Sequence, residues 1–147
     1  MNKSFNTIVV SGKSNVGKTS AIKEFVGMAL KLKETKLLEQ IPEKHDYWFK
    51  FSINNKVVGV ITFGDSAKAI SKAFKYLGKC DYYVCASHLY GETVNTVQNL
   101  KGIINPLFIN KIGINKNNDC SQESFDEDNK RFSNQLLVLF KYMIKAC

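Results

Sequence analysis

One short segment of the chain combines residue types at a spacing that suits phosphate chemistry. Residues 12–19 fit the pattern G-x-x-x-x-G-K-[ST] without a mismatch. Glycines let the backbone curl so that successive N–H groups point at phosphate oxygens, and the helix that follows presents its positive end to the same anion. In this pattern Lys18 would reach the β- and γ-phosphates, and the Thr19 hydroxyl would ligate Mg²⁺. The residues expected to bind the nucleotide are Gly12, Lys13, Ser14, Asn15, Val16, Gly17, Lys18, Thr19 and Ser20.

A carboxylate follows an apolar run later in the chain. The run over 57–63 leads into Gly64 and Asp65, and an acid at the end of a buried strand beside a phosphate loop can hold Mg²⁺ directly or through water. We therefore expect Thr19 and Asp65 to hold the metal, and Lys18 and Asp65 to serve the chemistry. The alternative is that Asp65 only caps the following helix, and the two roles are compatible.

These two segments resemble the Walker A and Walker B motifs of the P-loop NTPase superfamily. The loop wording is similar to that of ribosome-assembly and tRNA-modifying GTPases, in which Asn-x-Gly-Lys-[ST] is common. It also resembles the deviant loop of the MinD/ParA ATPases, where a lysine after the first glycine reaches the partner subunit's nucleotide. Lys13 occupies that place, so this resemblance implies a homodimer in which Lys13 reaches the second nucleotide. The alternative is a loop lysine that faces solvent. Residues 64–94 resemble a stretch of small uncharacterised bacterial P-loop proteins, which names no activity.

The chain departs from the GTPase pattern in two places. Asp65 is followed by Ser-Ala-Lys rather than by x-x-Gly, and no water-orienting glutamine comes shortly after it. At the expected guanine-binding motif N-K-x-D, residues 115–118 are Asn-Lys-Asn-Asn, and an amide cannot accept both guanine N–H groups as a carboxylate does. We therefore expect ATP, with GTP as the alternative, together with Mg²⁺, and slow hydrolysis without a partner.

Several other polar residues are candidates without a settled role. His88 could contact phosphate or carry a proton, or it could be a hydrogen-bonded loop histidine. Glu92 is most simply the first-turn acid of a helix. Arg131 is the only arginine in the chain and therefore the only internal candidate for an arginine finger. The four cysteines form no C-x-x-C pair and are interpreted as small buried hydrophobes rather than zinc ligands.

Hydrophobic periodicity indicates the elements that must position these residues. It predicts a strand over 7–10, directly before the loop, and an amphipathic helix directly after it. Residues 47–53 and 56–63 are expected to form a hairpin around an Asn-Asn turn, and residues 37–42 a connection. The remaining expected elements are a helix over 66–77, a strand over 82–86, a helix near 94–100, a strand over 107–114 and a helix from 124.

This order predicts an α/β protein with a three-layer P-loop fold. The expected sheet is mostly parallel, with about five strands, one antiparallel edge strand and helices on both faces. Ligands of such sheets bind beyond the carboxyl ends of the strands, which would bring the 12–19 loop and Asp65 to one rim. No linker or repeat divides residues 1–147, so we expect a single nucleotide-binding domain.

Composition excludes some classes and favours others. A chain of 147 residues with 44% hydrophobic and 23% charged residues is not wholly disordered. It contains no run of roughly 18–20 apolar residues and no secretory signal, so we expect a cytoplasmic protein without a membrane segment. The net charge of +8 favours polyanions. Lysines 68, 72, 75 and 79 would share one helix face, which could meet a nucleic-acid backbone or simply be solvated.

Three functions from different classes remain. The first is a Mg²⁺-dependent nucleoside triphosphate-binding protein that acts as a slow NTP hydrolase or switch, stimulated by a protein partner or by dimerisation. The second is a small P-loop kinase for a nucleotide or small molecule, although an arginine-bearing phosphate lid cannot be built from one arginine. The third is a GTPase-like or nucleic-acid-associated binding module.

Overall fold

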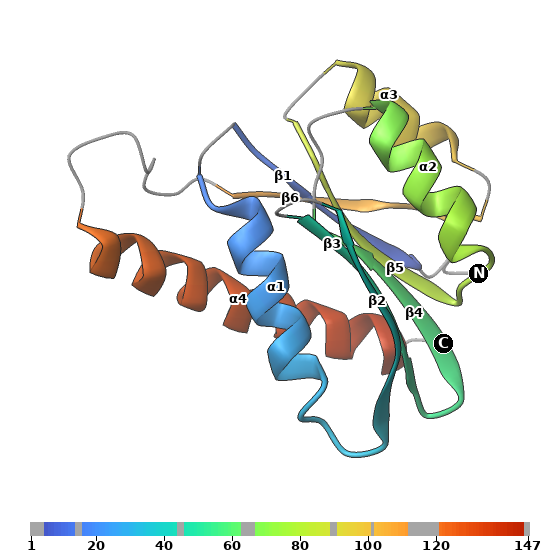
Figure 1. The fold of residues 1–147 in the computed structure, drawn as a ribbon, viewed down its shortest axis with the longest axis horizontal. Helices are drawn as coiled ribbons and strands as arrows, with labels where there is room; N and C mark the ends of the chain where they lie inside the picture. Colours follow the sequence, from blue (N-terminus) through green and yellow to red (C-terminus); the bar gives the residue numbers. More distant parts are fainter. Residues whose placement is uncertain are drawn as a thin grey trace.

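The fold is described by a computed structural model in which β-strands and helices alternate over most of the chain (Figure 1). The described residues are 5–13, 16–43, 46–62, 67–88, 91–100, 102–111 and 121–145. In chain order the elements are β1 (Thr7–Ser11), α1 (Lys18–Ala29), β2 (Thr35–Glu43), β3 (Asp46–Ile53), β4 (Lys56–Ile61), α2 (Ala67–Leu77), β5 (Tyr82–Ser87), α3 (Glu92–Asn99), β6 (Leu107–Asn110) and α4 (Gln122–Lys145). No helix in these ranges is both long and apolar enough to cross a membrane.

Within the described residues, six strands form one mixed sheet in the order β2-β3-β4-β5-β1-β6. The strand β1 pairs in parallel with β5 on one side and β6 on the other, and β4 pairs in parallel with β5. The pairs β2–β3 and β3–β4 are antiparallel. The prediction of a P-loop fold with a mostly parallel sheet of about five strands is therefore wrong. The strand expected at the antiparallel edge, β3, lies inside the sheet because β2 covers it.

The missed strand β2 explains this error. The sequence predicts a connection over 37–42 because Pro42 ends the segment. Edge strands tolerate proline and irregular patterns, since one of their sides needs no ladder partner. The pairing of β2 with β3 shifts between Leu37 and Glu39, and Leu38 remains 44% exposed. A strand that buries few apolar side chains leaves little periodicity to detect.

The hairpin of β3 and β4 was predicted correctly. Asn54 and Asn55 connect the two strands with φ values of 49° and 65°. Asparagine tolerates this left-handed region better than most residues, and two such residues make the turn whose twist matches an antiparallel hairpin.

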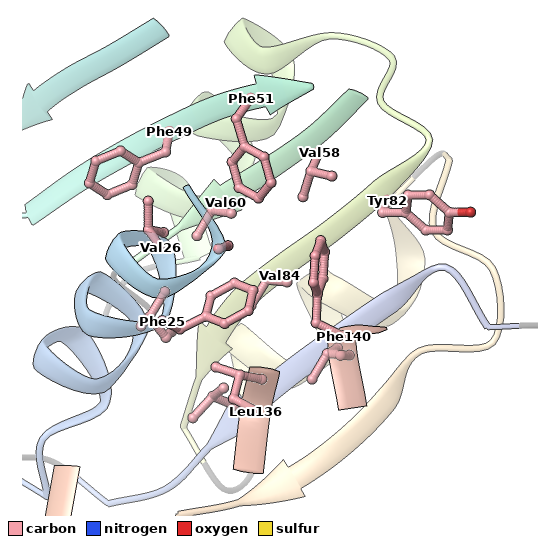
Figure 2. Close-up of a cluster of buried hydrophobic side chains, with 14 of the residues drawn as sticks. Phe25, Val26, Phe49, Phe51, Val58, Val60, Tyr82, Val84, Leu136 and Phe140 are labelled. Atoms are coloured by element: carbon pink, nitrogen blue, oxygen red, sulfur yellow. The ribbon is translucent and has the colours of Figure 1, made fainter. Parts of the chain in front are cut away.

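Two apolar clusters hold the helices against opposite faces of the sheet. One lies under α1 and α4, where the Phe140 ring is 5.2 Å from Phe25 and 6.1 Å from Phe51 (Figure 2). The other lies under α2 and α3 and includes Val9, Trp48 and Cys85 among its members. Every residue of β5 is buried because both faces of this strand are covered. The sheet thus forms a rigid base on which the carboxyl end of β1 is fixed.

Candidate functional site

The 12–19 loop joins the carboxyl end of β1 to the first turn of α1. Gly17 is the N-cap of α1, with φ 92° and no side-chain capping bond. Residues other than glycine rarely adopt a positive φ of this size, so the backbone conformation explains why position 17 is a glycine. The first turn of α1 contains no acidic residue. No acidic side chain of α1 therefore neutralises the positive end of the helix dipole. This leaves the positive end available to an anion.

Lys18 is buried and bridges the loop to β5. Its side chain is 7% exposed, and Nζ donates hydrogen bonds to the carbonyl oxygens of Gly12 at 2.7 Å and Ser87 at 3.0 Å. Burial of an ammonium group is costly unless oxygen atoms compensate it. The ends of β1 and β5 provide these oxygens because the two strands are paired in parallel up to Ser11 and Ser87.

Thr19 ties α1 to the end of β4. Its hydroxyl donates to the carbonyl oxygen of Thr62 at 2.9 Å, directly after the last residue of β4. The strand therefore runs toward the segment with Asp65, but Asp65 itself lies outside the described residues, as do Ser14 and Asn15. The joint metal role of Thr19 and Asp65 stays a prediction. Across the described ranges, no group of three or more histidine, cysteine or acidic side chains could hold a metal ion.

The other predicted loop residues differ in exposure. Val16 is buried and Gly12 is closely packed, since a Cβ added to Gly12 would lie 2.9 Å from the carbonyl oxygen of Lys111. Lys13 and Ser20 are exposed. The structure therefore brings Gly12, Val16, Gly17, Lys18 and Thr19 together, whereas Lys13 and Ser20 face solvent.

Lys111 is a site residue that sequence reasoning missed. It follows β6 directly and is only 2% exposed. Its Nζ donates to the carbonyl oxygen of Val16 at 2.6 Å and to the carboxylate of Asp128 at 2.9 Å. It also lies 5.5 Å from the centre of the Phe132 ring. A second buried ammonium thus holds the loop from the β6 side, opposite to Lys18.

A sequence signal for Lys111 existed but was ambiguous. The dipeptide Asn-Lys occurs five times in the chain, and the copy expected to begin the guanine-binding motif is the one at 115–116. The copy that directly follows an apolar strand is Asn110-Lys111. In that register the last motif residue is Gly113, which also supplies no carboxylate. Residues 112–120 lie outside the described structure, so the earlier candidate at 115–118 stays untested.

The helix α4 packs against the loop and α1 through polar side chains that periodicity did not indicate. Asn129 is 2% exposed and lies so close to Gly17 that a Cβ on this glycine would overlap with its carboxamide. One turn later, the hydroxyl of the buried Ser133 lies 2.7 Å from the carbonyl oxygen of Ala21 and 2.8 Å from that of Asn129, and it shares its single hydrogen between these two acceptors. With the Asp128–Lys111 ion pair, these contacts join α4 to the site.

The remaining candidates occupy more ordinary positions. The backbone N–H of His88 donates to the hydroxyl of Thr93 at 3.0 Å, which joins the end of β5 to α3. Glu92 is exposed in the first turn of α3, as predicted for a first-turn acid. Arg131 is exposed on α4. An internal arginine finger would have to turn from solvent toward the loop.

The described cysteines are buried hydrophobes, as predicted. Burial raises the pKa of the Cys85 thiol to about 12, and it also raises the pKa of Cys80 against a smaller lowering by Lys50. Both thiols therefore stay protonated at neutral pH and are poor nucleophiles. Cys120 and Cys147 lie outside the described residues.

A cavity of about 540 Å³ lies at the opposite end of the parallel strands. The apolar side chains of Phe74, Tyr83 and Leu100 line it, together with Lys75 and Lys79. The Tyr83 hydroxyl there donates to the carbonyl oxygen of Gly78 at 3.0 Å. No residue of the 12–19 loop borders this cavity, so it is separate from the candidate site.

Comparisons with known proteins do not assign the chain to a family. No family model, curated protein or solved structure matches it. The function is therefore inferred from the residues and contacts of the 12–19 loop and its surroundings.

Proposed function

We propose that this protein binds ATP with Mg²⁺ at the 12–19 loop and acts as a slow nucleotide hydrolase or nucleotide-dependent switch. The observation that carries the proposal is the buried Lys18, whose ammonium is held by the carbonyl oxygens of Gly12 and Ser87 at the first turn of α1. A fixed cation beside an uncapped helix start is complementary to a polyphosphate. The full match to G-x-x-x-x-G-K-[ST] supports the same ligand.

Each loop residue has a defined task in this proposal. Lys18 supplies a positive charge to the terminal phosphates, and the loop backbone N–H groups donate hydrogen bonds to the remaining phosphate oxygens. The hydroxyl of Thr19 and the carboxylate of Asp65 are the proposed Mg²⁺ ligands. The metal, when bound, neutralises phosphate charge. A hydroxyl oxygen and a carboxylate suit Mg²⁺, which prefers oxygen ligands.

The choice of ATP rests on an absent carboxylate. Neither residues 115–118 nor the Asn-Lys pair at 110–111 is completed by an acid at the fourth place. Guanine has two adjacent N–H groups that a carboxylate accepts together. A guanine-specific site would therefore lack its main selective group in this chain.

Slow turnover follows from what surrounds the expected metal site. Ser66 stands where many ATPases have a glutamate, and the only arginine is exposed on α4. Positive charge at the terminal phosphate is worth orders of magnitude in rate when an arginine supplies it. We therefore propose that a protein partner or a second copy of the chain stimulates hydrolysis.

Calorimetric titration of ATP and GTP, with and without Mg²⁺, tests binding directly. We expect Mg²⁺-dependent ATP binding with a Kd on the order of micromolar, and at least roughly 100-fold weaker binding by Lys18→Ala. The matched control is Lys75→Ala, which removes an exposed lysine at the other end of the molecule and should bind as the native chain does. A folded native protein that binds neither nucleotide would refute the proposal.

Product analysis distinguishes the hydrolase from the kinase alternative. A slow hydrolase should release phosphate from ATP without any other substrate, whereas a kinase should form ADP only when an acceptor is supplied. Tight nucleotide binding without turnover in either assay would favour a nucleotide-dependent switch. The affinity of the protein for a partner should then differ between the ATP-bound and the ADP-bound state.

A further inference from the structure

The carboxamide of Asn129 is buried beside the loop and has no hydrogen-bond partner among the residues that the structure describes. The residue is 2% exposed, and neither the nitrogen nor the oxygen of its carboxamide makes a hydrogen bond within the described part of the chain. Buried polar groups are nearly always paired, because desolvation without a partner destabilises the folded protein. A buried asparagine whose carboxamide nitrogen and oxygen are both unpaired therefore requires a physical explanation.

The carboxamide lies against the backbone turn that precedes Lys18. A Cβ added to Gly17 would overlap with it, and Gly17 has a positive φ that few other residues adopt. The two other polar groups of α4 in this contact are paired: Asp128 with Lys111, and Ser133 with the carbonyl oxygen of Ala21. Of these three described groups only the carboxamide that touches the loop is unpaired, which suggests that its partner belongs to another arrangement of the loop.

We propose that Asn129 senses whether the 12–19 loop holds a phosphate group. On phosphate binding, the loop backbone around Gly17 turns and brings a peptide group to the carboxamide, which couples the occupied loop to α4. A carboxamide has both a donor and an acceptor, so it can pair with either end of a peptide group. Asn129 is thus a positioning residue that acts through the loop, and this inference rests on the proposed nucleotide binding.

The energetic signature of such a residue is unusual. A ligand shifts an equilibrium toward the arrangement that it binds better. If the carboxamide is paired only when the loop holds a ligand, its removal should not lower the stability of the ligand-free protein. It should lower the stability of the ligand-bound protein. A carboxamide already paired in the free protein, for example through a buried water, would behave in the opposite way.

Thermal unfolding of Asn129→Ala tests this, with Mg²⁺-ATP and inorganic pyrophosphate as the probes. We expect a Tm without ligand equal to or above that of the native chain, because alanine is the better helix former and leaves no unpaired group. The ligand-induced rise in Tm should be smaller and correspond to roughly tenfold weaker binding. Pyrophosphate isolates the loop from contacts with the base and the ribose.

The matched control is Ser133→Ala, one helical turn away. The Ser133 hydroxyl has two partners, so its loss should lower the Tm of the free protein by about 3 °C. The ligand-induced rise should stay as in the native chain. Asn129→Ser, whose hydroxyl can bond to a carbonyl of its own helix, is the second variant if the alanine variant folds poorly.

Hydrogen exchange provides a readout that a purely structural role would not change. Pyrophosphate should slow amide exchange in the part of α4 around residues 125–133 of the native chain, and this slowing should be absent from Asn129→Ala.

Two results would overturn the Asn129 inference alone. One is an equal ligand-induced rise in Tm for Asn129→Ala and the native chain, with Lys18→Ala giving none. The other is a clearly lower Tm of Asn129→Ala without ligand, which would mean that the carboxamide is already paired. If the native chain itself shows no rise with any nucleotide or with pyrophosphate, the proposed function fails and the inference fails with it.

Discussion

Two sets of lysines in this protein lie in opposite environments. Lys18 and Lys111 are buried at the carboxyl end of β1, where each ammonium donates to two protein oxygen atoms. Lys68, Lys72 and Lys75 are exposed along α2. An ammonium group can enter the interior only where carbonyl or carboxylate oxygens replace its water, whereas a surface lysine needs no such arrangement. The net charge of +8 counts both sets equally and therefore says little about where an anion binds.

The glycines near these two sets of lysines also differ, in how closely neighbouring side chains pack against them. Gly17 in the loop and Gly78 after α2 have positive φ values of 92° and 69°. A Cβ on Gly17 would overlap with Asn129, while a Cβ on Gly78 would meet nothing within 4 Å. The loop is thus defined by close packing from α4 as well as by its backbone conformation, and the end of α2 by conformation alone.

The largest effect on stability is expected from Lys111→Met compared with Lys75→Met. Loss of the buried ammonium leaves the carbonyl of Val16 and the carboxylate of Asp128 without this partner, and we expect the free energy of unfolding to fall by about 3 kcal/mol. The exposed substitution should change it by less than about 0.5 kcal/mol. Urea unfolding measures both, and equal effects would show that burial does not distinguish the two lysine sets.

A smaller effect is expected from Gly17→Ala compared with Gly78→Ala. Both variants force alanine into a left-handed conformation, which costs about 1 kcal/mol. The overlap with Asn129 should add about 1 kcal/mol or more at Gly17. In an Asn129→Ala background this second part should disappear, so the double-mutant cycle isolates the contact. Additive effects would mean that α4 does not confine the loop.

The smallest effect concerns β5, the strand that joins the two regions, and it depends on pH. The Cys85 pKa rises from 9.0 to about 12 on burial. As the pH rises, the Cys85 thiol therefore loses its proton in the unfolded chain before it does so in the folded protein. The contribution of this thiol to the stability of the folded protein is complete below pH 9 and is lost progressively as the pH rises toward 12. At pH 10 the native chain should be about 1 kcal/mol less stable, relative to Cys85→Ala, than at pH 8. A pH-independent difference between the two unfolding curves would contradict the burial of this thiol.

Local features of the chain were predictable because their causes are local. The Asn54-Asn55 hairpin and the helix after the loop follow from residues within a few positions of each other. The β2 strand was not predictable in this way, since its ladder partner β3, rather than its own apolar pattern, makes it a strand.

The sequence by itself determined the motif at 12–19, the helix that follows it and the hairpin around Asn54-Asn55. Only the tertiary structure decided that Lys111 and Ser133 meet this region, through hydrogen bonds that span 95 and 112 residues of the chain. It also decided the mixed sheet and the burial of Asn129 against Gly17. The physical reason is that periodicity tells which face of an element is apolar, whereas the neighbour that covers this face, and hence which polar groups lose water, depends on the packing of the whole chain.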